Sequence, residues 1–115
     1  MTSQKLVQKA IEIVEDKKAR DVVLLNLKKI FPIIDYFVIC TGDSSLHMKS
    51  IAQALEKELE EKGIKQLNRR HFTNDLWILL DFGSLVVHIF SKSGRDFYQL
   101  ERLWADAEKE CSVGA

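Results

Sequence analysis

A turn of small residues, Thr41-Gly42-Asp43-Ser44-Ser45, is the part of the sequence whose residue types best suit catalysis. Free backbone N–H groups in a strand-to-helix turn can hold an anion, and nucleotidyltransferases place a Gly-Ser pair at such a turn. Those enzymes also need two carboxylates, two residues apart on the following strand, to hold magnesium. Here a phenylalanine and a glycine follow Asp81, so the second acid is missing. The pattern favours a structural turn and helix cap at Gly42 and Ser44. A nucleotide-binding or nucleotidyltransferase-like enzyme using this turn is the alternative function.

Residue types that bind metals are present, but their spacing does not form a site. The three histidines, His47, His71 and His88, make no i,i+4 pair and no His-x-His pair, and Cys40 and Cys111 make no Cys-x-x-Cys motif. A zinc site needs several such ligands to converge. We therefore expect no metal, no cofactor and two reduced thiols. His88 falls inside an apolar strand, where we expect it to be hydrogen-bonded.

The charges of the chain are balanced, with 17 lysines and arginines against 17 aspartates and glutamates. There is no overall field to draw the protein onto phosphates or an anionic membrane, so any contact with nucleic acid must be local. Arg69-Arg70-His71 with Phe72 is the basic cluster that has an aromatic residue beside it. It suits either a small RNA-binding patch or, as the favoured interpretation, an edge strand whose charges prevent sheet-to-sheet pairing.

Length and composition indicate one domain. Of the 115 residues, 46% are hydrophobic, which is enough apolar material to close a core without disulfides or a metal. We predict a single domain over residues 1–110 and a frayed tail over residues 111–115. The N-terminus leads into a mixed polar and apolar helix and does not read as a signal peptide, and no apolar run approaches the roughly 20 residues of a membrane helix. The default expectation is a cytoplasmic protein without membrane contact.

Hydrophobic periodicity predicts three helices separated by groups of strands. Helical spacing covers residues 3–17, residues 44–62 and the chain from Ser93 onward; Ser44 or Ser45 can cap the second helix and Gly63 can end it. Apolar runs typical of strands cover 22–27, 36–41, 76–81 and 86–90, with a turn at Gly83, and residues 67–72 are a weaker strand candidate.

The connections between these elements restrict the topology. The first two strands are joined by too short a link for a crossover helix and should be antiparallel, whereas the strand–helix–strand step over residues 36–72 permits a parallel pair. The predicted fold class is α/β (α+β), a mixed, roughly five-stranded sheet packed by helices in the order α-ββ-α-βββ-α.

Alternation along residues 76–81 separates two kinds of side chain. Trp77, Leu79 and Asp81 share one face of the strand, and Ile78 and Leu80 share the other. The aliphatic face suits the core. The Trp77 face, which carries the acid, is predicted to meet a partner, because tryptophan is a frequent anchor of interfaces.

The last helix carries two further large aromatic side chains, Tyr98 and Trp104. Trp104 lies on the same helical stripe as Phe97 and Leu100. We therefore expect Trp104 to pack inward.

Six segments, in the right order and at the right spacing, resemble one known family. They are Asp16–Asp21, Asp35–Ile39, Thr41–Ser45, Trp77–Gly83, Val86–Phe90 and Arg95–Trp104. Taken together they are similar to the ribosomal silencing factors, also called the RsfS or Iojap family, over about residues 5–106.

This resemblance implies a nucleotidyltransferase-like fold without enzymatic activity. It implies binding to the large ribosomal subunit through its fourteenth ribosomal protein, on the face that meets the small subunit, which would block joining and repress translation under nutrient limitation, as in stationary phase. We expect local contact with ribosomal RNA, and a homodimer when the protein is free. The partner-binding residues predicted in this way are Trp77, Asp81, His88, Arg95 and Tyr98, with structural roles for Gly42, Ser44 and Gly83.

Two positions depart from the family pattern. Asn26 stands where an aspartate is usual, and Arg70-His71 stands where a Glu-Gly pair is usual. The second departure changes the charge of the segment leading to Trp77, so affinity for the partner can differ from that of other members.

Overall fold

A six-stranded mixed sheet forms the centre of the molecule in a computed structural model that describes residues 2–30, 33–66, 68–73, 76–98 and 108–113. The strand order across the sheet is β3-β4-β5-β2-β1-β6. The strands are β1 (Arg20–Asn26), β2 (Tyr36–Thr41), β3 (Asn68–Thr73), β4 (Trp77–Asp81), β5 (Leu85–Phe90) and β6 (Glu108–Val113). The helices are α1 (Ser3–Asp16), α2 (Ser45–Glu61) and α3 (Lys92–Tyr98). The predicted class, helices packed on a mixed sheet, is confirmed.

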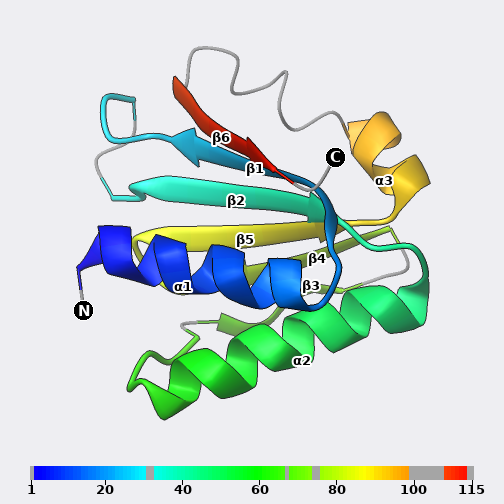
Figure 1. Ribbon diagram of the computed structural model, residues 1–115, viewed down its shortest axis with the longest axis horizontal. Helices are drawn as coiled ribbons and strands as arrows, with labels where there is room; N and C mark the ends of the chain where they lie inside the picture. The colour runs from blue at the N-terminus through cyan, green and yellow to red at the C-terminus, as the bar shows by residue number, and fades with distance from the viewer. Residues whose placement is uncertain (1, 31–32, 67, 74–75, 99–107, 114–115) are drawn as a thin grey trace.

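Helices α1 and α2 lie side by side on one face of the sheet, and the short α3 follows the carboxyl end of β5 (Figure 1). The Thr2 hydroxyl caps α1 by accepting the Lys5 N–H at 3.2 Å. The Ser44 hydroxyl caps α2 by accepting the His47 N–H at 3.0 Å, and α2 ends just before Gly63. Both helices therefore start where a hydroxyl satisfies a free N–H. No helix in the described residues is long and apolar enough to cross a membrane.

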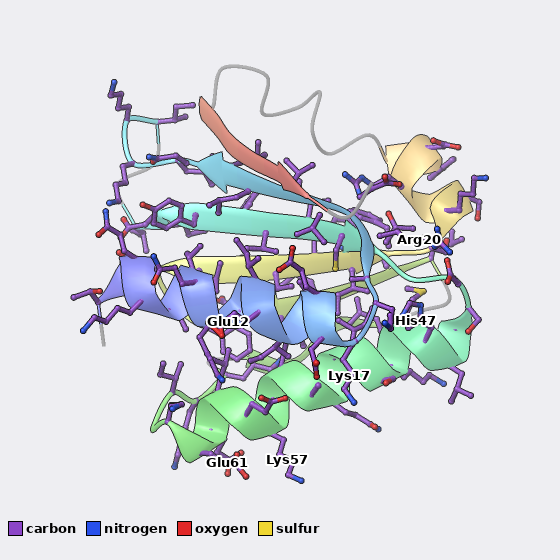
Figure 2. All side chains as sticks on the ribbon, viewed as in Figure 1. Glu12, Lys17, Arg20, His47, Lys57 and Glu61 are labelled. Atoms are coloured by element: carbon purple, nitrogen blue, oxygen red, sulfur yellow. The ribbon has the colours of Figure 1, made fainter. Side chains whose placement is uncertain are left out.

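The core between the two helices and the sheet is built from apolar side chains on one stripe of each helix and one face of each central strand. It includes Leu6, Val7, Ala10, Val14, Ile51, Leu55, Leu59, Val38, Ile78, Leu80, Val87 and Ile89, all at most 5% exposed. Charged side chains such as Lys57 and Glu61 point away from the sheet (Figure 2). The helical stripes thus fix which face of the sheet α1 and α2 cover.

The parallel pair lies elsewhere than the sequence predicted. β1 and β2 are antiparallel, as expected, but the strand parallel to β2 is β5, with Val38 opposite Val87, and not β3. Every residue of β2 and of β5 is buried, as expected for a parallel pair at the centre of a sheet. β3, with Arg69 and Arg70 in its sequence, forms an edge of the sheet, as its charges predicted.

The chain after α3 corrects two further expectations. Residues 108–113 form β6, antiparallel to β1 with Cys111 opposite Leu24, so the sheet has six strands and not five. The frayed tail predicted from residue 111 is therefore wrong for residues 111–113. The physical reason is that the middle of β1, Val22 to Leu25, is apolar and buried, and without β6 its outer N–H and C=O groups would lack partners.

The predicted final helix is described only as far as Tyr98. Phe97, expected to face the core with Trp104, is 74% exposed. Residues 99–107, including Trp104, lie outside the described residues, so the inward packing of Trp104 stays a prediction.

Candidate partner-binding face

The sheet face opposite α1 and α2, here called the distal face, carries a second apolar cluster. Its buried members are Val23, Leu25, Leu27, Phe37, Ile39, Val86 and Phe90, and Ile34, Trp77 and Leu79 pack against them while staying partly exposed. The alternation predicted for β4 is confirmed, since Ile78 and Leu80 are 5% and 3% exposed on the side that faces the helices. The distal face is where the predicted partner-binding side chains of β4 and β5 meet.

Trp77 lies across two neighbours on β5. Its ring stacks on Phe90, with centroids 5.1 Å apart and an interplanar angle of 26°. Its indole Nε1–H donates to Nδ1 of His88 at 3.2 Å. Such a partly exposed indole, backed by aromatic side chains, has the chemistry of an interface anchor.

His88 is almost completely buried behind Trp77, at 3% exposed. Because Nδ1 accepts the indole proton, the neutral ring must carry its own hydrogen on Nε2. That Nε2 has no hydrogen-bond partner among the described residues. Burial lowers the pKa of His88 to about 3, so the ring is neutral at physiological pH. The structure supports the hydrogen-bonded strand histidine expected from sequence, and leaves almost none of this ring at the surface for a partner.

Asp81 serves the hairpin between β4 and β5. Its Oδ1 accepts the N–H of Gly83 at 2.9 Å, and Gly83 has φ +95°, a left-handed conformation that favours glycine. The Asp81 side chain is nevertheless partly exposed on the distal face. Its role as a partner contact stays a prediction.

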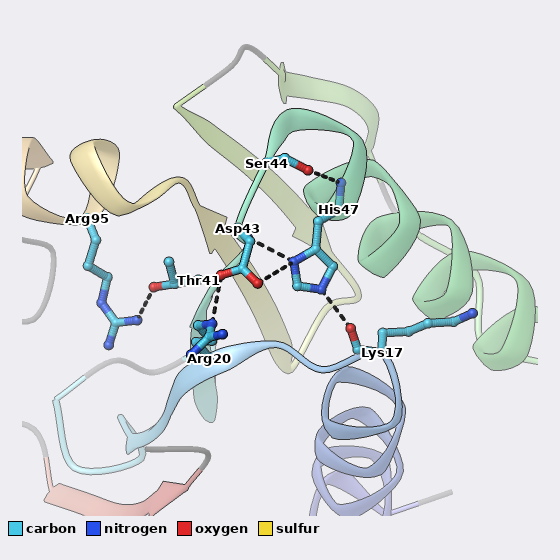
Figure 3. Close-up of polar contacts among 7 residues, drawn as sticks. All are labelled: Lys17, Arg20, Thr41, Asp43, Ser44, His47 and Arg95. Atoms are coloured by element: carbon cyan, nitrogen blue, oxygen red, sulfur yellow. Dashed lines mark hydrogen bonds and ion pairs between the residues drawn. The ribbon is translucent and has the colours of Figure 1, made fainter.

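Arg95 and Tyr98 come from α3. The Arg95 Nη1 donates to Oγ1 of Thr41 at 2.8 Å, which ties α3 to the end of β2 (Figure 3). The same Nη1 donates to the carbonyl oxygen of Asp21 at 2.8 Å, which ties α3 to β1. The side chain of Tyr98 lies outside the described residues. Arg95 already has a structural role, so the structure does not group it with Trp77.

Burial raises the pKa of the nearby Cys40 to about 12 despite the guanidinium of Arg95, which lowers it. This thiol, on the side of β2 that faces the helices, is therefore protonated and unreactive at neutral pH.

A polar cluster that the sequence analysis did not predict joins α1, β1 and α2 (Figure 3). We call it the His47 clasp: Arg20 Nε donates to Asp43 Oδ1 at 2.7 Å, Asp43 N–H donates to His47 Nδ1 at 2.8 Å, and His47 Nε2 contacts the Lys17 carbonyl oxygen at 2.7 Å. Because Nδ1 accepts, Nε2 must be the donor. The four-residue spacing of Asp43 and His47 is a sequence signal that could have predicted their contact. No local sequence signal indicates that Arg20 or Lys17 joins them.

The same turn is occupied by its own hydrogen bonds. The Gly42 N–H donates to the Phe90 carbonyl at 2.9 Å, and the Asp43 N–H is taken by His47. A Cβ at position 42 would lie 2.7 Å from the Met48 side chain, so glycine is needed for the close approach of α2. No group of three or more potential metal-ligating residues occurs in the described part of the chain. The geometry is that of a helix start. The N–H groups of Gly42 and Asp43, which a phosphate would need, are already hydrogen-bonded within the protein.

These features define a small α+β domain whose candidate site is a partly exposed face of a sheet. Comparison with known proteins gives the family. Residues 1–114 match the model of a family described as "Ribosomal silencing factor during starvation". The chain belongs to this family.

Individual relatives agree with that assignment. The chain is 44% identical to the ribosomal silencing factor RsfS of Halalkalibacterium halodurans, over 93% of this chain and 92% of that protein. A crystal structure of a protein from Chromobacterium violaceum superposes with a TM-score of 0.86 and 30% identity, covering 98% of this chain and 93% of the other. A mouse protein named mitochondrial assembly of ribosomal large subunit protein 1 is 29% identical over 82% of this chain and 42% of its own length.

Proposed function

We propose that this protein represses translation by docking on the large ribosomal subunit and keeping the small subunit away. The contact would be made with the fourteenth large-subunit ribosomal protein, on the face between the subunits, chiefly when nutrients are limiting. The family description supports a silencing role under starvation, and the name of the mouse relative connects the family to the large subunit.

The observation that carries the proposal is the distal face around Trp77. A tryptophan that is partly exposed and stacked on a buried phenylalanine offers a large, rigid contact area at little cost in conformational entropy. Leu79 and Asp81 lie beside it on β4, one apolar and one charged. This mixture of an anchor with a polar neighbour is typical of protein interfaces.

Size and charge are compatible with this mode of action. The protein exposes 6767 Å², and a standard interface takes about 800 Å² from each partner, or about an eighth of that surface. The balanced charge suits recognition of a protein beside RNA, because a strongly basic domain would bind ribosomal RNA at many places. Contact with RNA would then be local.

Co-sedimentation with separated ribosomal subunits tests the proposal. We expect binding to large subunits alone, and fewer joined ribosomes when the protein is added before the small subunits. Trp77→Ala should weaken binding about thirtyfold or more, the loss typical of an interface hot spot. The matched control is Leu46→Ala on α2, a side chain that is 78% exposed but belongs to the helix layer. Equal binding to both subunits, or equal losses in the two variants, would contradict the proposal.

We extend the proposal to the free protein. A surface that a partner normally covers is sticky when vacant, so the distal face should pair two copies in the absence of ribosomes. Light scattering over a dilution series should show the mass of a dimer at high concentration and of one chain at low concentration. A mass of one chain throughout would contradict this extension.

A further inference from the structure

We propose that His88 is a positioning residue, which holds the indole of Trp77 in the orientation that a partner meets without touching the partner itself. This inference rests on the proposed function, because it assigns a task to a residue behind the docking surface. His88 was predicted to contact a partner and lies in the distal face, yet it is only 3% exposed.

The position of His88 lets it orient the side chain of Trp77. Trp77 pairs with Phe90, and the next residue along the same face of β4, Leu79, pairs with His88, so the indole and the imidazole are diagonal neighbours. Stacking on Phe90 fixes the plane of the indole, and the bond from Nε1 to Nδ1 fixes its rotation within that plane. An indole held in this way loses less conformational freedom when a partner arrives.

The apolar surroundings of the His88 imidazole indicate that it lowers the stability of the fold. Phe37 meets the His88 ring edge-on with centroids 4.5 Å apart, and Phe90 and Leu79 are among its further apolar neighbours. In that setting the Nε2–H has no acceptor among the described residues, and burying a donor without an acceptor destabilises a fold. An aliphatic side chain would avoid this cost. What the imidazole supplies in return is the acceptor for Trp77, and its low pKa keeps that acceptor unprotonated at neutral pH.

Two substitutions of similar size separate positioning from packing. His88→Asn keeps an oxygen near the place of Nδ1 and can still accept the indole proton, whereas His88→Leu replaces that acceptor by a methyl group. The first measurement is the indole N–H resonance of Trp77 in the free protein, assigned by its disappearance in Trp77→Phe. We expect it to shift upfield and exchange faster with water in the leucine variant, and to stay close to wild type in the asparagine variant.

The second measurement is affinity for the large subunit. His88→Leu should bind about five- to tenfold more weakly, the equivalent of one hydrogen bond, and His88→Asn should stay within about twofold of wild type. The leucine variant should melt at the wild-type temperature or above, since it removes a buried donor that has no acceptor among the described residues. Weaker binding by an equally stable variant would not result from a purely structural role.

A double-mutant cycle completes the test. In a Trp77→Phe background the indole N–H is absent, so His88→Leu should have no further effect on binding. An unchanged indole resonance in His88→Leu, or equal losses for the leucine and asparagine variants, would overturn the inference. If Trp77→Ala itself leaves binding intact, the proposed function of the distal face fails, whatever the resonance shows.

Discussion

The two faces of the sheet are both apolar, but they are built differently. The side under α1 and α2 is closed by two stripes of aliphatic residues, and its polar groups stand at the rim, where the His47 clasp joins α1 to α2. The distal face places a tryptophan and a buried histidine among its apolar residues and leaves Trp77, Leu79 and Asp81 partly exposed.

Under the proposed function, the helix-covered face serves stability and the distal face serves recognition. Burial of complementary aliphatic side chains stabilises the fold, and a polar atom buried among them would lower that stability. A face that keeps an indole at the surface, and behind it an imidazole whose Nε2 has no partner among the described residues, gives up some stability. Such exceptions to packing rules are expected where a surface has a function. Substitutions on each face test whether stability and recognition divide in this way.

The largest effect should come from the helix-covered face. Ile89 is fully buried between β5 and the helices, and Ile89→Ala should cost about 2–5 kcal/mol of a stability near 5–15 kcal/mol. Leu79→Ala, on the partly exposed distal face, should cost about 1 kcal/mol. Thermal melts would show a drop of about 10 °C or more for the first and only a few degrees for the second. Equal drops would mean that the distal face is a second closed core.

The next effect concerns acid. His88 has a pKa of about 3 in the folded protein and about 6.5 when unfolded, so the unfolded chain binds the extra proton between those values. Stability from this group is therefore complete above pH 6.5 and falls as the pH drops towards 3, by on the order of 4 kcal/mol in all. Urea unfolding at pH 7, 6, 5 and 4 should show a shallower pH dependence for His88→Leu than for wild type. Parallel curves would place His88 in contact with water.

Much of this contrast could be predicted from the sequence. Period-two alternation assigned Trp77, Leu79 and Asp81 to one face of β4, and helical periodicity placed α1 and α2, because both signals are local. The parallel neighbour of β2 could not be predicted from local signals, since it depends on which strands are apolar enough to occupy the centre of the sheet. β6 was missed for a related reason: its polar sequence becomes a strand only because β1 needs a partner.

The candidate site shows the same limit. Asp43 and His47 are four residues apart and can be paired from the sequence, but Arg20 and the Lys17 carbonyl reach the clasp through the fold. The bond between Trp77 and His88 depends on the register of β4 against β5, which the hairpin at Gly83 sets. The family was predicted better than the geometry, because six ordered segments identify a family without determining single contacts.

A smaller effect should come from the rim of the helix-covered face. His47→Ala removes the acceptor for Asp43 N–H and the donor to Lys17, and should cost about 1–2 kcal/mol, with no loss of large-subunit binding. Arg20→Ala breaks an ion pair whose side chains are 61% and 55% exposed, and should cost less than about 1 kcal/mol. Urea denaturation measures both. A loss of binding in His47→Ala at unchanged stability would move the docking surface to the α1–α2 end of the molecule.

The last prediction is that nucleotides have no effect, and it tests whether the turn at the start of α2 has only a structural role. A nucleotide phosphate would need free N–H groups in this turn, yet those of Gly42 and Asp43 are already bound. The Asp43 carboxylate would also repel a phosphate. We therefore expect no transfer of a nucleotide to any acceptor with magnesium or manganese present. We also expect no magnesium-dependent thermal shift with ATP.

The assay is sensitive enough to make that absence informative. A ligand at a hundred times its Kd would stabilise the fold by about 2.7 kcal/mol, or several degrees in Tm. Ser44→Ala is the control, because losing the helix cap should lower stability by about 1 kcal/mol whether or not ATP is present. Turnover that Ser44→Ala abolishes would make the turn a catalytic site, and the distal face would then no longer be the functional side of this protein.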